Sequence, residues 1–329
     1  MPSEIVPAIN PVPDDFAGNS PGKIAQRLFH ATRPKFFPAS VLPVLAGTAW
    51  GFRISGSFDI GIFLLALLAT VCVHAAANVL NDVGDDAGGT DRVNEDRIYP
   101  YTGGSRFIQT GIMAAVTMAR LGISLLGVAA IAGIVLLLQK GPIILAFGLT
   151  GVTLAVLYSV GPVRLSGLGI GEAAIAVAFG VLPVTGAAWL QSGTLNAELL
   201  AYSLPVSAWV AAILLINEVP DVGPDGATGK RTLPVRLGLD GTSVLYSALH
   251  LFAMAAVVYL TVTGALPLAA PVMPAILLYL AVRSAAAIRR GLQDRHGMRC
   301  AIEATIGIHT LGSVWLCACV LFSAWSPAG

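Results

Sequence analysis

Charged residues are scarce in this chain of 329 residues. Only 11% of its residues are Asp, Glu, Lys or Arg, while 56% are hydrophobic, and soluble domains carry roughly 25% charged residues. Together with a mean hydropathy of +0.79, this composition excludes an ordinary soluble domain and indicates an integral membrane protein. The net charge of +1 gives no indication of nucleic-acid binding, so we expect no nucleic acid among the partners.

Two further features are missing. The four cysteines, Cys72, Cys300, Cys317 and Cys319, lack the spacing of a disulfide framework or a metal site, so we interpret them as packing residues. The N-terminal segment has no apolar stretch typical of a signal peptide and holds five prolines. We therefore expect residues 1–25 to form a mobile cytosolic tail and residues 26–329 to form a single membrane-embedded domain.

Long apolar runs fill the rest of the chain. A membrane-spanning helix needs about 20 mostly apolar residues, and no run here has the alternating pattern of a barrel strand. The sequence therefore predicts an all-α, polytopic membrane protein with nine transmembrane helices. The nine runs cover residues 36–53, 58–80, 112–138, 142–160, 168–191, 197–217, 243–264, 267–288 and 301–324.

Basic residues are distributed very unevenly between the two sides of these runs. Of the 19 Lys and Arg residues, 17 fall on one side, and only Arg53 and Lys140 fall on the other. Because cytosolic loops carry an excess of Lys and Arg, we place the crowded side in the cytosol. This prediction puts the N-terminus inside and the C-terminus outside.

No Lys or Arg occurs between residues 54 and 91, yet an acidic motif ends this stretch. If the helix of the second run continues, Asn78, Asp82 and Asp85 share one of its faces, and Asn81 lies one turn before Asp85. Carboxylates this close repel one another, and a hard divalent cation such as Mg²⁺ would relieve the repulsion. The motif therefore predicts part of a magnesium site at a cytosolic helix end.

A second acidic motif follows the sixth run. Asn217, Asp221 and Asp225 are spaced by four residues, as on one helical face, and Lys230 and Arg231 come soon after. Both motifs follow even-numbered helices, which suggests a pseudo-repeat of helices 1–4 and 5–8 with a ninth helix added. Two such clusters on one side of the membrane indicate two walls of a single polar site.

Carboxylates beside basic residues, at the end of apolar helices, suit a substrate with a diphosphate head and a long apolar tail. Magnesium ions would bridge the carboxylates and the phosphate oxygens, and Lys and Arg would bind the remaining charge. A polyprenyl diphosphate has this shape, with its head at the helix ends and its tail between helices in the lipid bilayer.

The motifs resemble those of the UbiA superfamily of intramembrane prenyltransferases. The resemblance lies in N-D-x-x-D-x-x-x-G-x-D from Asn81 to Asp91, and in D-x-x-x-D-x-x-x-G-K-R-T-L-x-V-R-L-G from Asp221 to Gly238. Within the superfamily the match is closest to the 1,4-dihydroxy-2-naphthoate polyprenyltransferases of menaquinone biosynthesis. One departure is the segment Ile98 to Arg106, where Gly-Pro-Leu-Arg is expected in the naphthoate enzymes. Because of this departure, the motifs do not fix the identity of the aromatic acceptor.

The resemblance implies nine helices around a central cavity, in a multi-pass protein of the bacterial inner membrane. It also implies a distinct role for each group of polar residues at the cytosolic side. Carboxylates hold two Mg²⁺ ions, amides assist them, and basic residues stabilise the leaving diphosphate. Tyr158 shields the allylic cation with its ring, and Arg106 or Arg164 pairs with the acceptor's carboxylate. The implied residues are Asp82, Asp85, Asp221 and Asp225 for the metals, Asn78, Asn81 and Asn217 for assistance, and Arg97, Lys230 and Arg231 for the diphosphate.

Other functions stay open at this point. The acceptor could be 4-hydroxybenzoate, homogentisate or a lipid alcohol, because the acidic motifs are expected to bind the prenyl donor and do not indicate which acceptor is used. A CDP-alcohol phosphotransferase is disfavoured, because its D-G-x-x-A-R motif is incomplete after Asp225. A transporter is disfavoured because transported ions favour carboxylates near the bilayer midplane, whereas the helix centres here are nearly free of them.

Overall fold

The computed structural model describes residues 10–89, 97–159 and 165–325. Within these ranges all regular structure is helical and no strand is present, so the predicted all-α class is confirmed. Every predicted apolar run contains a helix. The long elements are α2 (Pro38–Ser55), α3 (Ile60–Gly88), α5 (Ala115–Lys140), α6 (Ile143–Ser159), α9 (Ala197–Asn217), α11 (Leu233–Val262), α12 (Val272–Arg290) and α13 (Arg295–Trp325).

One further long helix is composite. It begins as α7 (Gly171–Ile175), continues through the π-helical turn η4 (Ala176–Val181) and ends as α8 (Leu182–Ser192). Six helical segments in the described ranges are long and apolar enough to cross a membrane, and the last of them, Val272–Ser323, holds both α12 and α13. The chain is therefore an integral membrane protein.

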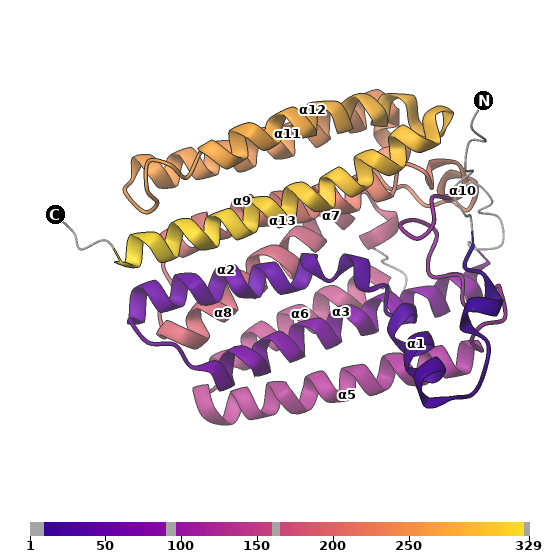
Figure 1. Cartoon of the computed structure of the whole chain (residues 1–329), viewed down its shortest axis with the longest axis horizontal. Helices are drawn as coiled ribbons and strands as arrows, with labels where there is room; N and C mark the ends of the chain where they lie inside the picture. The colour runs from indigo at the N-terminus through magenta and orange to yellow at the C-terminus, as the bar shows by residue number, and fades with distance from the viewer. Residues whose placement is uncertain (1–9, 90–96, 160–164, 326–329) are drawn as a thin grey trace.

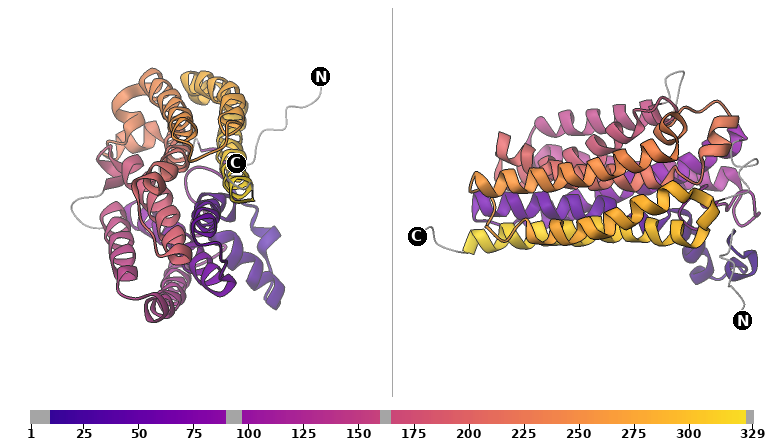
Figure 2. Two further views of the ribbon diagram at one scale, coloured as in Figure 1. Left: turned by 90° about the vertical axis from the view of Figure 1, so that its left-hand side faces the viewer. Right: turned by 90° about the horizontal axis from the view of Figure 1, so that it is seen from above.

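The long helices run side by side along one axis and form a bundle (Figures 1 and 2). The short helices α1 (Pro21–Ala31) and α10 (Val222–Ala227) lie at one end of this bundle, and the last turns of α13 lie at the other (Figure 1). Because α3 and α9 end where α10 lies, both acidic motifs come to the same end of the bundle.

Close helix contacts hold the bundle together. α3 packs on α5, α2 on α8 and α13, and α9 on α11. At the α2–α8 contact the backbones approach so closely that a Cβ atom on Gly47 would lie 2.1 Å from the carbonyl oxygen of Val184. Gly51, one turn later, meets Ala188 in the same way. Small residues spaced by four are the usual means by which membrane helices approach one another.

The segment before α2 packs onto the end of the bundle that carries the acidic motifs. Within the predicted mobile tail, residues 10–25 include the 3-10 helix η1 (Pro13–Phe16) and the first turn of α1. Arg27 Nη1 donates to the carbonyl oxygen of Phe16 at 2.8 Å, and the Phe16 ring lies edge-on to Phe107 at 4.9 Å. The structure thus gives these residues a packed arrangement, while residues 1–9 lie outside the described ranges.

Candidate active site

The first acidic motif lies on the last turns of α3. This helix continues to Gly88, and Gly89 ends it in the left-handed conformation, with φ of 75°, which glycine adopts without strain. The predicted continuation of the apolar helix through the motif is therefore confirmed. Asp85 accepts a hydrogen bond from Asn81 Nδ2 at 2.8 Å, whereas Asn78 Nδ2 donates to the carbonyl oxygen of Thr32 at 3.0 Å and so ties α3 to the end of α1.

Asp82 is the most deeply buried carboxylate of the first motif. It is 3% exposed, and its Oδ2 atom accepts a hydrogen bond from the backbone N–H of Ser105 at 2.9 Å. Its other oxygen, Oδ1, is buried without a hydrogen-bond partner among the described residues. A buried carboxylate oxygen without a donor is costly, and such an atom is a candidate ligand for a cation.

The second acidic motif is arranged differently from the prediction. A continuous helix was expected to carry Asn217, Asp221 and Asp225, but α9 ends at Asn217 and α10 begins only at Val222. Pro220 accounts for the break, because it lacks a backbone N–H and disfavours helical geometry at the residue before it. Asp221 therefore caps α10, while Asp225 lies within α10 and is 6% exposed.

Lys230 joins the two motifs. Its Nζ atom lies 3.5 Å from Asp85 Oδ1 and 3.5 Å from Asp225 Oδ1, so one residue of each acidic motif contacts the same ammonium group. Burial lowers the pKa of the Lys230 ammonium, but the two carboxylates outweigh this effect and raise it above its ordinary value. Burial likewise raises the pKa of the Asp225 carboxyl against the opposing attraction of Lys230.

Tyr158 lies beside the same polar site, at the end of α6. Its ring carbon Cε2 is 3.5 Å from where a Cβ atom on Gly171 would stand, so the ring packs against the start of α7. Asp85 and Asp225 are both within electrostatic reach of its hydroxyl group. Tyr158 therefore lies near the acidic motifs, and its role in shielding an allylic cation stays a prediction.

A pair of glutamates also belongs to this region, and the sequence analysis did not predict their contact. Glu172, at the start of α7, hydrogen-bonds to Glu218, which directly follows α9. Burial and the charge of Glu172 raise the pKa of Glu218 well above its ordinary value. Their spacing of 46 positions in the sequence explains why no local motif indicates the pair.

The arginines predicted to bind the diphosphate or the acceptor lie in loops, outside the long helices. Arg97 is buried, and its guanidinium donates to Asn10 Oδ1. Arg106 has a left-handed backbone, with φ of 64°, and its carbonyl oxygen accepts from Thr110. Arg231 donates its backbone N–H to the carbonyl oxygen of Gly167 at 2.9 Å. Arg164, the other candidate for the acceptor's carboxylate, lies outside the described residues.

His74 lies two turns before Asp82 on α3, but it faces the packing between helices. It is 6% exposed, hydrogen-bonds to Ser40 on α2, and meets the Phe179 ring edge-on at 4.8 Å. The structure thus makes His74 a hydrogen-bonded core residue.

The donor atoms of the site fit a hard, oxygen-preferring cation. Asp82 Oδ1 and Asn217 Oδ1 are both buried without a hydrogen-bond partner among the described residues. The described ranges contain no group of three or more His, Cys, Asp or Glu side chains arranged around one point. The chemistry of the donors, all of them carboxylate or amide oxygens, is that of a Mg²⁺ site.

Comparison with known proteins agrees with this geometry. Residues 40–302 match the model of the UbiA prenyltransferase family. The chain is 33% identical over 268 residues to the 1,4-dihydroxy-2-naphthoate octaprenyltransferase of Mycobacterium tuberculosis, covering 80% of this chain and 86% of that protein. It is 31% identical over 219 residues to the Escherichia coli enzyme of the same name, covering 65% of this chain and 69% of that protein.

Solved structures share the fold at lower identity. A UbiA homologue from Aeropyrum pernix K1 in its apo form superimposes with a TM-score of 0.65 at 17% identity, covering 88% of this chain and 98% of that one. A UbiA homologue from Archaeoglobus fulgidus bound to GPP and Mg²⁺ has a TM-score of 0.57 at 16% identity, covering 88% and 99%. Since the family match spans most of the sequence and both acidic motifs, this chain belongs to the UbiA prenyltransferase family.

Proposed function

We propose that this enzyme transfers a polyprenyl group from a polyprenyl diphosphate to 1,4-dihydroxy-2-naphthoate. The reaction forms a carbon–carbon bond between the allylic C1 of the donor and a ring carbon of the acceptor. It breaks the C1–oxygen bond to the diphosphate and releases CO₂ from the acceptor's carboxylate. The relatives named for this reaction in Mycobacterium tuberculosis and Escherichia coli support this choice of acceptor.

The observation that carries the proposal is the position of Lys230 between the two acidic motifs. Its 3.5 Å contacts with Asp85 and Asp225 bring together residues that are 140 positions apart in the sequence. An ammonium group between carboxylates, at the end of apolar helices, provides the mixture of charges that a metal-bound diphosphate requires. The same arrangement has no evident use in a protein that binds only apolar ligands.

Four aspartates would hold two Mg²⁺ ions, namely Asp82, Asp85, Asp221 and Asp225, with Asn78, Asn81 and Asn217 assisting. When bound, the ions neutralise the diphosphate and make it a better leaving group. The homologue bound to GPP and Mg²⁺ supports a divalent cofactor. The two unpartnered oxygens, Asp82 Oδ1 and Asn217 Oδ1, support a cation at this place in the present chain.

The other residues act on the substrates themselves. Lys230, Arg97 and Arg231 bind the departing diphosphate through charge-assisted hydrogen bonds. Tyr158 presents its ring to the allylic cation that forms at C1. The apolar walls of a central cavity between the helices exclude water, so that the cation reacts with the aromatic ring of the acceptor and not with solvent.

The alternatives differ in the acceptor or in the reaction class. A purified enzyme in detergent would be given a labelled polyprenyl diphosphate, Mg²⁺ and, separately, 1,4-dihydroxy-2-naphthoate, 4-hydroxybenzoate, homogentisate and a glycerol phosphate lipid. We expect a prenylated product and CO₂ release with the naphthoate. Transfer to another acceptor alone would change the acceptor and keep the reaction class, whereas transfer to none would reject the prenyltransferase assignment for this chain.

We further propose nine membrane spans with the site at the cytosolic face of the bacterial inner membrane. Arg53 and Lys140 lie in the last turns of α2 and α5, at the end of the bundle opposite the acidic motifs (Figure 1). This separation supports an orientation with the N-terminus inside and the C-terminus outside.

The orientation predicts opposite labelling of two exposed loops. In a background in which the exposed Cys300 is replaced by Ser, Thr228→Cys reports on the loop after α10 and Thr194→Cys on the loop between α8 and α9. A membrane-impermeant thiol reagent added to intact cells should label only Thr194→Cys. Labelling of Thr228→Cys under these conditions would reverse the proposed orientation.

A further inference from the structure

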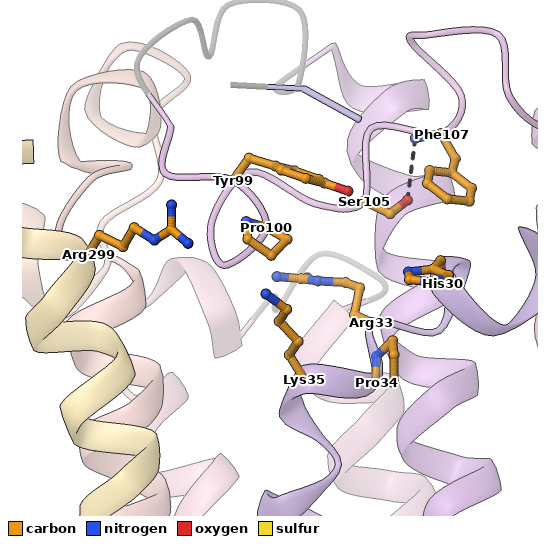
Figure 3. A pocket seen from close by; sticks show the side chains of 9 residues that line it. All are labelled: His30, Arg33, Pro34, Lys35, Tyr99, Pro100, Ser105, Phe107 and Arg299. Carbon is orange, nitrogen blue, oxygen red and sulfur yellow. Dashed lines mark hydrogen bonds between the residues drawn. The ribbon is translucent and has the colours of Figure 1, made fainter. Parts of the chain in front are cut away.

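A cationic cavity lies beside the acidic motifs, at the same end of the bundle. Its volume is about 440 Å³. It opens between the segment that leads into α2, the loop that follows α3 and the start of α13 (Figure 3). Nine residues line it, namely His30, Arg33, Pro34, Lys35, Tyr99, Pro100, Ser105, Phe107 and Arg299.

Three basic side chains point into this cavity. Figure 3 shows the side chains of Arg33, Lys35 and Arg299 directed toward the same space next to Pro100. None of the nine described residues that line the cavity carries a carboxylate. Glu303 lies close by, but its Oε1 atom already accepts hydrogen bonds from Arg299 Nε and from the Tyr101 hydroxyl, each at 3.0 Å.

A second carboxylate, Asp15, lies near the rim of the cavity. It acts electrostatically on Tyr99, and together with burial it raises the pKa of that tyrosine above its ordinary value. Asp82, on which Arg33 acts electrostatically, is a third carboxylate nearby, but none of the three lines the cavity. The three basic side chains that line it give its wall a positive potential, which attracts an anion.

Several contacts fix the Arg33 side chain in a position from which it could bind an anion. Its Nη2 atom donates to the carbonyl oxygen of Tyr101 at 2.9 Å, and its guanidinium lies 5.0 Å from the centre of the Phe36 ring. Its Nε–H is buried without a hydrogen-bond partner among the described residues. The backbone is left-handed, with φ of 57°, which is uncommon for a residue other than glycine and is often found at functional sites.

The remaining walls suit a flat aromatic ring. Tyr99 and Phe107 contribute aromatic side chains, and Pro34 and Pro100 contribute apolar surface. One wall residue, Ser105, also donates its backbone N–H to Asp82 Oδ2 at 2.9 Å, so the cavity adjoins the first acidic motif. An anion bound here would therefore lie next to the group that we assign to the prenyl donor.

We propose that this cavity binds the acceptor, recognising an aromatic carboxylic acid through its carboxylate. The proposal rests on the proposed function for the identity of the acceptor. Cations at Arg33, Lys35 and Arg299 would bind the carboxylate, and the rings of Tyr99 and Phe107 would contact the aromatic part. A phosphate headgroup would use the cations but not the aromatic walls, which favours the aromatic acid. This site takes the place of Arg106 and Arg164 as the expected partner of the carboxylate.

Lys35→Met tests the charge in the cavity. Lys35 is exposed, and methionine keeps its apolar stem, so we expect the variant to fold. Loss of a charge-assisted contact should raise the KM for 1,4-dihydroxy-2-naphthoate about tenfold, with kcat and the KM for the polyprenyl diphosphate unchanged. The matched control is Arg289→Gln, which removes an exposed cation that pairs with Asp240 away from the cavity and should leave both KM values unchanged.

An acceptor without the carboxylate makes the test specific. For 1,4-dihydroxynaphthalene, which keeps the two hydroxyl groups and the rings, Lys35→Met and Arg299→Gln should not change the KM. An equal rise with both acceptors would mean that the variants act through general packing, and this result would overturn the proposal. A rise in the KM for the polyprenyl diphosphate would also overturn it, because the cavity would then serve the diphosphate.

Direct binding separates this proposal from the proposed function. Equilibrium dialysis of 1-hydroxy-2-naphthoate against the purified wild-type protein needs no turnover. If no acceptor is prenylated but the naphthoate binds to the wild type and about tenfold more weakly to Lys35→Met, the cavity assignment holds and the proposed reaction fails. If the enzyme prenylates the naphthoate while both proteins bind it equally, the reaction holds and the cavity assignment fails.

Discussion

Asp82→Ala is expected to reduce prenyl transfer on the order of a thousandfold or more, while the protein still folds and inserts into the membrane. The variant removes a buried carboxylate with one oxygen held by Ser105 and the other without a partner. With the ligand gone, the diphosphate loses part of the positive charge that stabilises it as a leaving group. Product formation from a labelled polyprenyl diphosphate and the acceptor measures the loss.

A matched control for this variant is Asp240→Ala. Asp240 is a carboxylate at the same end of the bundle, but its side chain is 94% exposed and its partner is the exposed Arg289. Surface pairs of this kind contribute little, so the control should retain activity close to that of the wild type. If Asp82→Ala kept near-normal turnover at saturating Mg²⁺, the assignment of the first motif to the metal would be wrong.

Lys230→Met is expected to affect both activity and stability. Without its ammonium group, Asp85 and Asp225 lose the cation that lies 3.5 Å from each of them. Turnover should fall roughly a hundredfold to a thousandfold, because the leaving diphosphate loses a charge-assisted donor. In the absence of divalent ions the variant should also melt at a lower temperature than the wild type, since the two carboxylates then repel each other.

Added Mg²⁺ gives this variant a distinctive signature. Binding of a cation to the folded state raises the apparent stability. The effect should be larger in the variant, because the charges of Asp85 and Asp225 are no longer balanced by Lys230. We therefore expect a larger Mg²⁺-dependent rise in melting temperature for Lys230→Met than for the wild type, measured by thermal unfolding in detergent. Equal rises, with activity unchanged, would show that Lys230 is not part of the donor site.

The sequence predicted the helices and the meeting of the two motifs for a simple physical reason. A backbone in lipid has to satisfy its own hydrogen bonds, so each long apolar run becomes a helix. Because each motif directly follows such a run on the side rich in Lys and Arg, the motifs had to emerge at one end of the bundle. Neither prediction required knowledge of how the helices pack against each other.

Features that depend on how the helices pack could not be predicted from apolar runs and local motifs. The break after α9 was missed because a spacing of four residues indicates one helical face only where the helix is continuous, and Pro220 interrupts it. The cationic cavity combines Arg33, Tyr99 and Arg299, which lie far apart in the sequence. No local sequence motif brings these three residues together.

Ser105 connects the places that we assign to the two substrates. Its backbone N–H holds Asp82, and its side chain lines the cationic cavity, so one residue is shared by the places that we assign to donor and acceptor. A donor that repositions the Asp82 carboxylate therefore changes the wall against which the acceptor rests. Thermodynamic linkage then requires the converse, because the acceptor alters the affinity for the donor by the same factor. If the two sites are where we propose them, a single hydrogen bond would couple the binding of the two substrates.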